Sequence, residues 1–124
     1  MTETQKPTII CMTTDPDRNM VELALAAGIS EVVDKQLLVG PAFLNRFIGQ
    51  TVIVVDDAPW TTSAIANLAE RVGLPVTTYN DPEETLAAII ALHPDIVLTD
   101  FKMPGMSGIE LTQKIRAHST QGEK

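Results

Sequence analysis

Polar and charged side chains stand in this chain at the points where its predicted strands end. They are Thr13 and Thr14 after the first strand, Lys35 after the second, Asp56 and Asp57 after the third, and Asp100 after the fifth. Parallel strands bring their carboxyl ends to one edge of a sheet, and ligands of open parallel sheets bind beyond that edge. We therefore expect these side chains to share one polar pocket on an apolar scaffold.

The pocket would hold the three carboxylates of Asp56, Asp57 and Asp100 at close range. Such groups repel one another, and their pKa values rise unless a cation joins them. Mg²⁺ is the expected cation, because it binds one or two carboxylates together with waters and phosphate oxygens. The ammonium of Lys35 and a threonine hydroxyl can bind phosphoryl oxygens. A carboxylate beside a metal can act as a nucleophile, so the set indicates phosphoryl transfer to an aspartate.

Each of these residues also has an ordinary structural explanation when it is taken alone. An Asp-Asp pair after a strand is often only a turn, an aspartate such as Asp100 commonly ends a strand, and Lys35 could be a solvated surface lysine. Directly after Asp100, however, positions 103–108 form a tight loop of Met, Pro, Gly and Ser. With all these features in one chain, chance becomes a poor explanation.

Strands and helices are predicted to alternate along the whole chain. The strands, rich in β-branched or apolar residues, are Thr8–Thr13, Glu31–Asp34, Thr51–Val55, Pro75–Tyr79 and Asp95–Thr99. The helices, marked by helical spacing and capping residues, are Asp17–Ala27, Pro41–Ile48, Thr61–Val72, Pro82–Leu92 and Ser107–Ala117. This alternation predicts an α/β fold with a parallel sheet.

The bulk composition excludes several classes of protein. A length of 124 residues indicates one domain, 1–124, with a polar tail at 119–124 that we expect to fray. The apolar runs are shorter than the ~20 residues that a membrane span needs, and no secretory signal is recognisable, so we expect a cytoplasmic protein. The net charge of −7 argues against direct nucleic-acid binding. The single cysteine, Cys11, cannot form an internal disulfide, and we expect it to be buried.

Two strings, VVDD at 54–57 and VLTDFKMPGMSG at 97–108, resemble the receiver domain of bacterial two-component response regulators. The second string is highly specific to that family. The resemblance implies that Asp100 accepts a phosphoryl group. It also implies that Asp57, Asp100 and the backbone carbonyl of Lys102 bind Mg²⁺, while Asp56 acts mainly through water.

The order of the parts differs from that of the family, where the acidic pair comes first, followed by the phosphoacceptor, a threonine and a lysine. Here Thr13 and Lys35, which match the family's switch hydroxyl and its lysine, precede the acidic pair. Residues 8–50 resemble the last two βα units of a receiver and residues 51–118 the first three, with nothing duplicated. This order indicates a circular permutation. The expected fold is flavodoxin-like: a five-stranded parallel sheet with helices on both faces and strand order 2-1-3-4-5 in family numbering.

A single permuted chain is sterically reasonable. The connection through Gly49 and Gln50 has a normal length, and the new crossover would be right-handed, as nearly all such crossovers are. The alternative is the tail of one receiver followed by the head of another. Such a chain would complete its sheets only by exchanging segments in an intertwined homodimer.

Several residues depart from the family or have no assigned role. The family usually has an aromatic residue three positions before the lysine and a proline directly after it, but this chain has Val32 and Gln36. The usual coupling from the threonine to an aromatic surface is therefore not expected. We expect Trp60 to be a half-buried aromatic at a helix start, and His93 and His118 to be surface residues.

These observations favour a signalling switch over an enzyme. We expect a phosphoacceptor that takes a phosphoryl group from a histidine kinase or a histidine phosphotransfer protein onto Asp100. The alternative is a pseudo-receiver that docks other proteins without phosphate. A phosphatase with an aspartyl nucleophile is a weaker possibility, because such enzymes typically carry a second aspartate two positions later, where this chain has Lys102.

Overall fold

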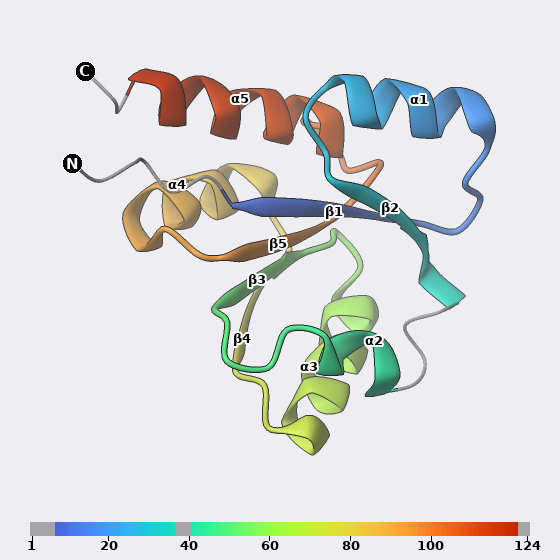
Figure 1. Ribbon diagram of the computed structural model, residues 1–124, viewed down its shortest axis with the longest axis vertical. Helices are drawn as coiled ribbons and strands as arrows, with labels where there is room; N and C mark the ends of the chain where they lie inside the picture. The colour runs from blue at the N-terminus through green and yellow to red at the C-terminus, as the bar shows by residue number, and fades with distance from the viewer. Residues whose placement is uncertain (1–6, 37–40, 122–124) are drawn as a thin grey trace.

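Five strands form the central layer of the computed structural model, and helices cover both faces of that layer (Figure 1). The structure describes residues 7–36 and 41–121. The strands are β1 (Thr8–Thr13), β2 (Glu31–Asp34), β3 (Val52–Val55), β4 (Val76–Tyr79) and β5 (Ile96–Asp100). The helices are α1 (Arg18–Ala26), α2 (Pro41–Asn45), α3 (Pro59–Val72), α4 (Pro82–Leu92) and α5 (Gly108–Gln121).

The sheet has the order β2-β1-β5-β3-β4, and every neighbouring pair of strands is parallel. If the strands are numbered from the one that precedes the acidic pair, β3 becomes the first strand and the order reads 2-1-3-4-5. The predicted α/β class and strand order are therefore confirmed. β5 is the central strand, and it joins the two parts of the chain by pairing with β1 on one side and β3 on the other.

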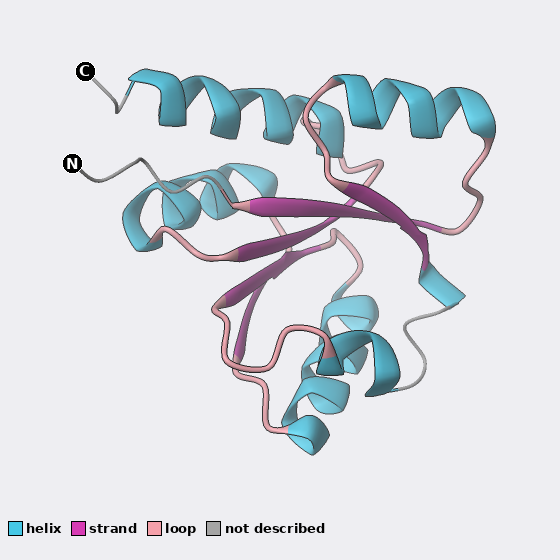
Figure 2. Ribbon diagram, in the orientation of Figure 1, coloured by secondary structure: helices cyan, strands magenta, loops and turns pink. Residues whose placement is uncertain are grey.

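Successive residues of the strands point to opposite faces of the sheet and pack into two separate apolar cores, as expected for a sheet covered on both faces. On one face, Ile10 and Met12 of β1 pack with side chains of α2 and α3. On the other face, Ile9 and Cys11 pack with side chains of α1, α4 and α5. Figure 2 shows this division of the helices between the two sides of the sheet. Cys11 is fully buried, as predicted.

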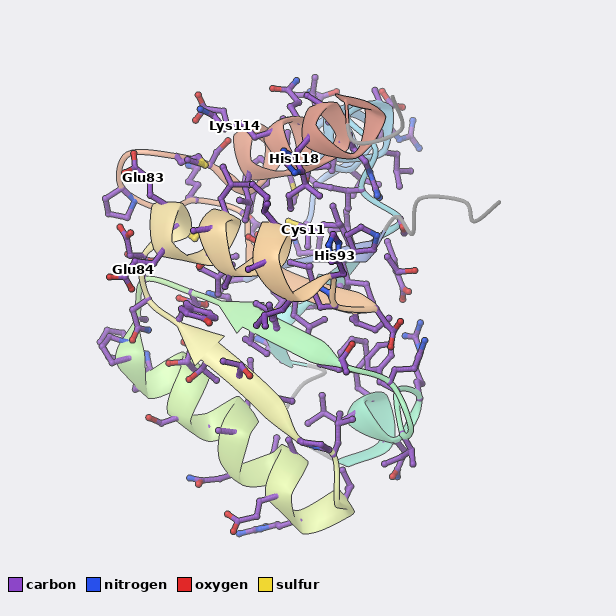
Figure 3. The ribbon with its side chains drawn as sticks, turned by 90° about the vertical axis from the view of Figure 1, so that its left-hand side faces the viewer. Cys11, Glu83, Glu84, His93, Lys114 and His118 are labelled. Carbon is purple, nitrogen blue, oxygen red and sulfur yellow. The ribbon has the colours of Figure 1, made fainter. Side chains whose placement is uncertain are left out.

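Local sequence signals set the helix boundaries. The Asp17 carboxylate accepts a hydrogen bond from the amide of Met20 at the start of α1, and Asp81 accepts one from Glu84 at the start of α4. Helix α4 ends at Leu92, and the next residue, His93, caps it in a left-handed conformation with φ of 51°. Figure 3 shows Glu83 and Glu84 at one end of α4 and His93 at the other, with Lys114 and His118 along α5. Both histidines are exposed, as predicted.

The observed elements differ from the predicted ones mainly at their ends. Strands β3, β4 and β5 each begin one residue later than expected, and β5 includes Asp100. The regular helix α2 ends at Asn45, because the following amides bond to carbonyls three residues earlier in tighter turns. Helix α5 continues to Gln121, so part of the tail predicted to fray at 119–124 is helical; residues 122–124 lie outside the described residues.

The expectation for Trp60 was wrong. Trp60 is the second residue of α3, and 77% of its surface is exposed. The buried face of that helix is formed instead by Thr62, Ile65 and Ala69. The side chain of Trp60 therefore lies in solvent rather than in the core.

Candidate functional site

The fold brings the predicted site residues to the carboxyl edge of the sheet. Strand β1 lies between β2 and β5, with Met12 paired with Asp100 and Thr13 paired with Asp34. Lys35 follows β2 directly, so its side chain starts one strand away from Thr13 and two strands away from Asp100. The long lysine side chain covers this distance.

Lys35 forms ion pairs with carboxylates of two different strand ends. Its ammonium nitrogen Nζ lies 2.9 Å from Oδ2 of Asp56 and 3.1 Å from Oδ1 of Asp100. The side chain of Asp56 is fully buried, and that of Asp100 is 12% exposed. At these burial levels solvent screens the charges weakly, so Lys35 is the main internal counter-charge of the two carboxylates.

The pKa shifts follow from this arrangement. Burial raises the pKa of Asp100, the charge of Asp56 raises it further, and Lys35 only partly opposes both effects. Burial alone would lower the pKa of Lys35, but its interactions with Asp56 and Asp100 outweigh burial and raise it. Lys35 is therefore a cation at neutral pH, and the site favours a further positive charge beside Asp100.

The three carboxylates of Asp56, Asp57 and Asp100 form a cluster that could hold a metal ion. Each offers an oxygen atom, and these three atoms lie within 4.8 Å of one another. Asp56 Oδ1 accepts a hydrogen bond from the amide of Ala58, whereas the buried Oδ2 receives no well-aligned hydrogen bond from the described residues. The charge on this buried oxygen is balanced by the Lys35 ammonium alone, and two further carboxylates lie beside it. Such a cluster of oxygen ligands suits a hard divalent cation such as Mg²⁺.

A pocket of about 390 Å³ opens beside Asp100 on the side of β1. Its walls come from the segment after β1, the start of α1, Lys35 and the segment after β5, and the residues are Thr13, Thr14, Asp15, Asp17, Met20, Lys35, Asp100, Phe101 and Lys102. Thr13 is buried at this wall, and its Oγ1 accepts a hydrogen bond from the amide of Asp15 at 3.3 Å. Because that bond uses only a lone pair, the hydroxyl proton of Thr13 can be donated to another group.

The loop after β5 fixes the position of Asp100. The amide of Phe101 donates to the backbone carbonyl of Met12 and to Asp100 Oδ1, at 3.1 and 2.9 Å. The amide of Gly108 donates to the carbonyl of Phe101, and a Cβ atom on Gly108 would lie 2.5 Å from the backbone oxygen of Asp100. Only glycine fits there, since no heavier group can approach a carbonyl oxygen so closely.

Other loop residues predicted from the sequence also have defined places. Met103 and Met106 are buried and pack into the core beneath α5, as expected for loop packing. The side chain of Lys102 is exposed at the pocket. Among the described residues there is no cis peptide bond, so the turn at Lys35 and Gln36 is trans.

Sequence reasoning missed Asn80, which follows β4 at the same edge of the sheet. Its amide nitrogen Nδ2 donates to the backbone carbonyl of Asp56 at 2.7 Å and to Oγ1 of Thr62 at 3.1 Å. The available signal was its position: a polar residue after a predicted strand, as for the other site residues.

Comparison with known proteins identifies the family. The family model described as the response regulator receiver domain matches residues 52–123, which include Asp56, Asp57, Asp100 and Lys102. This segment is more than half of the chain. The chain therefore belongs to the receiver domain family of two-component response regulators. Thr13 and Lys35 lie outside the matched segment, in the part of the chain that supplies β1 and β2.

Curated relatives match somewhat more than half of the chain. A protein-glutamate methylesterase/protein-glutamine glutaminase of Haloarcula marismortui is 38% identical over 72 residues, 57% of this chain and 20% of that protein. The DNA-binding response regulator MtrA of Mycolicibacterium smegmatis is 34% identical over 70 residues, 56% of this chain and 31% of that protein. The sensor histidine kinase RcsC of Escherichia coli K12 is 40% identical over 65 residues, 52% of this chain and 7% of that protein.

The match thus covers less than a third of each of these three relatives. No solved structure matches the chain. In the described part of the chain, none of the helices has the length and apolar composition needed to cross a bilayer.

Proposed function

We propose that this chain is the phosphoacceptor of a two-component phosphorelay, and that it takes a phosphoryl group from a histidine kinase or a histidine phosphotransfer protein onto Asp100. The observation that carries the proposal is the position of the Lys35 ammonium, 2.9 Å from Asp56 and 3.1 Å from Asp100. An ammonium at this place neutralises the acceptor carboxylate before the reaction and binds a phosphoryl oxygen after it.

In the proposed reaction an oxygen of Asp100 attacks the phosphorus atom of a phosphohistidine. The new O–P bond forms as the N–P bond breaks, and the imidazole leaves and takes a proton from solvent. The amide of Phe101 holds Oδ1 of Asp100, which leaves Oδ2 as the attacking atom. Lys35 and the hydroxyl of Thr13 then bind two of the product oxygens. Attack of water on phosphorus later releases inorganic phosphate and restores the carboxylate.

The residues that would hold Mg²⁺ are Asp57, Asp100 and the backbone carbonyl of Lys102, with Asp56 acting mainly through water. When bound, the ion supplies positive charge for the phosphoryl oxygens in the transition state. The exposed carboxylate of Asp57 suits this role, because Mg²⁺ keeps several of its waters. The buried Oδ2 of Asp56 can accept a hydrogen bond from one of those waters.

We further propose that the chain is one circularly permuted receiver. Residues 8–50 supply the last two βα units, with Thr13 and Lys35, and residues 51–118 supply the first three, with the acidic pair and Asp100. The sheet order supports this proposal, because a single copy of each strand completes the family arrangement. The pocket also contains residues from both parts of one chain.

Incubation with acetyl phosphate and Mg²⁺, followed by intact mass spectrometry, tests the proposal. The chain should gain one phosphoryl group, and Asp100→Asn should gain none, whereas the matched exposed variant Asp15→Asn should still react. Beryllofluoride with Mg²⁺ should change the fluorescence of Trp60, the single tryptophan. If the parent chain binds Mg²⁺ but gains no phosphoryl group, or if Asp100→Asn reacts equally well, the proposal fails. A chain that also lacks Mg²⁺ binding would instead be a phosphate-independent docking module.

A further inference from the structure

Asn80 connects two loops at the carboxyl edge of the sheet, away from the pocket described above. It stands between the end of β4 and Asp81, the residue that caps α4. Its two N–H groups have different targets: the backbone carbonyl of Asp56, 2.7 Å from Nδ2, and Oγ1 of Thr62, 3.1 Å away. Because a carbonyl oxygen can only accept hydrogen bonds, the amide nitrogen rather than the amide oxygen of Asn80 must face Asp56.

This contact acts on the peptide group between Asp56 and Asp57. The hydrogen bond from Asn80 fixes the carbonyl of that peptide group, while the amide of Asp56 donates to the carbonyl of Tyr79 at 3.2 Å. On the other side, the Asp56 carboxylate accepts the amide of Ala58 at 2.9 Å. Of the hydrogen bonds named here that hold the segment 56–58, only the bond from Asn80 comes from a side chain outside it.

Asp57 depends on this backbone support. Asp57 is exposed, and its carboxylate accepts no hydrogen bond from the described residues. Only the backbone therefore places its Cα atom, from which the carboxylate extends towards the metal site. A carboxylate that must meet a metal ion at a defined distance gains from such support, because the backbone that carries it is then ordered before the ion binds.

The ordinary roles of an asparagine at this position are already filled by other groups. Asp81, and not Asn80, accepts the hydrogen bond from Glu84 that caps α4. The first turn of α3 has its own side-chain hydrogen bond, which does not involve Asn80: the hydroxyl of Thr62 donates to the carbonyl of Pro59. The bond to Asp56 is the shorter of the two that Asn80 makes, and it leads directly to the acidic pair.

We infer that Asn80 is a positioning residue for the metal site: its amide holds the 56–57 peptide group so that Asp57 can bind Mg²⁺. The inference rests on the proposed function, because it presumes that the acidic pair binds the ion. Residues that orient metal ligands from outside typically change metal affinity by roughly 10- to 100-fold when they are replaced.

Mg²⁺ titration of the full chain, followed by the NMR signals of the Asp57 and Ala58 amides, tests the inference. Asn80→Ala should weaken Mg²⁺ binding by about 10-fold. Asn80→Asp keeps the shape of the side chain but removes its two N–H donors, so it should weaken Mg²⁺ binding as well. The negative charge that this change adds would by itself strengthen Mg²⁺ binding. Thr62→Val removes the second acceptor, together with the bond from the hydroxyl to the carbonyl of Pro59, but leaves the bond from Asn80 to Asp56, and it should bind Mg²⁺ almost like the parent chain. Thr78→Ala, an exposed change on β4, is the matched control.

The outcomes separate the inference from the proposed function. A parent chain that does not respond to Mg²⁺ overturns both. A parent chain that responds, together with an unchanged affinity in Asn80→Ala and Asn80→Asp, overturns the inference alone. If Thr62→Val weakens binding as much as Asn80→Ala does, Asn80 acts through the packing of α3, and the inference is again overturned. Urea unfolding of each variant confirms that affinities are compared between folded proteins.

Discussion

The ammonium of Lys35 lies 3.1 Å from the Oδ1 atom of Asp100, although the two residues follow strands that are far apart in the sequence, β2 and β5. The contact is possible because a single strand, β1, lies between β2, which precedes Lys35, and β5, which ends in Asp100. The same ammonium reaches Asp56, so one lysine balances two carboxylates. The cationic side chain and the acidic residues thus form one electrostatic unit, and removing any member should affect the others.

Replacing Lys35 by methionine should lower the free energy of unfolding by about 2 kcal/mol in buffer without divalent ions. The change leaves the buried Oδ2 of Asp56 without its cation, and the loss of one partner of a buried ion pair is costly. Saturating Mg²⁺ should restore part of the loss, since the ion replaces the missing charge. Urea unfolding with and without Mg²⁺ measures both effects. Lys102→Met, which removes an exposed lysine beside the site, should change stability little; an equal loss there would contradict the prediction.

Asp100→Asn should raise the free energy of unfolding by about 1 kcal/mol at neutral pH without Mg²⁺, as is common when a functional charge is removed. Burial, with the charge of Asp56, raises the pKa of Asp100 despite Lys35. A carboxyl with a raised pKa stabilises the fold when protonated, and this contribution is lost as the pH rises from the ordinary carboxyl value through the raised one.

The advantage of Asp100→Asn over the parent chain should therefore increase with pH across that window and remain constant above it. Urea unfolding at a series of acidic and neutral pH values measures this difference. Glu22→Gln, on the exposed side of α1, serves as the control and should show no comparable trend. An advantage that decreases with rising pH would mean that Lys35 outweighs burial at this site.

Gly108→Ala should destabilise the protein by about 2 kcal/mol, because the new Cβ would lie 2.5 Å from the backbone oxygen of Asp100. Alanine normally stabilises a helix relative to glycine by about 1 kcal/mol, so a net loss isolates the steric clash. Phosphorylation by acetyl phosphate should also decrease, since Asp100 must move. At Gly105 no atom lies within 4 Å of an added Cβ, although φ is +83°. Gly105→Ala should therefore cost only backbone strain and should leave phosphorylation largely intact.

The fold could be predicted from the sequence because its strands are buried on both faces. Runs such as Val52–Val55 are almost entirely apolar, and the strand ends are marked by polar residues, so the predicted strands agree with the observed ones within one residue. The end of α2 was missed, because three-residue turns and helical turns share the same apolar spacing. The exposure of Trp60 was missed because a large aromatic suggests burial, whereas Thr62, Ile65 and Ala69 form the buried face.

The site was predictable where it depends on strand ends and unpredictable where it depends on backbone contacts. The positions of Lys35, Asp56 and Asp100 follow from parallel strands that share an edge. The contact from Asn80 to a backbone carbonyl leaves no trace in residue type, because any asparagine after a strand could equally be a turn residue. The close approach of Gly108 to Asp100 likewise depends on loop geometry and not on residue spacing alone.

Arg116→Met should lower the free energy of unfolding by about 2 kcal/mol. The guanidinium of Arg116, on α5, donates to the carbonyl of Pro7 and to that of Gly28, each at 2.8 Å. These hydrogen bonds connect the last helix to the start of β1 and to the turn before β2, and a charged donor contributes more than a neutral one. Lys114→Met, an exposed change on the same helix, should have little effect. Equal losses in the two variants, measured by urea unfolding, would show that helix charge rather than these bonds is responsible.

Light scattering should give the molar mass of one chain, 13.4 kDa, rather than twice that value. In a single chain the connection before β3 is closed by its own contacts. The Asp95 carboxylate accepts hydrogen bonds from the amide and the hydroxyl of Thr51, at 2.9 and 3.1 Å, and the Asp95 amide donates back to the Thr51 carbonyl. The amide of Gln50 donates to the carbonyl of Phe47, which turns the chain from α2 towards β3. The Thr51–Asp95 contacts lie within residues 51–118 and would form in either arrangement, whereas the tight turn at residues 47–50 joins the two parts of the chain and favours closure within one molecule over exchange with a second copy. A parent chain that is dimeric at every concentration would support segment exchange and would contradict the permuted monomer.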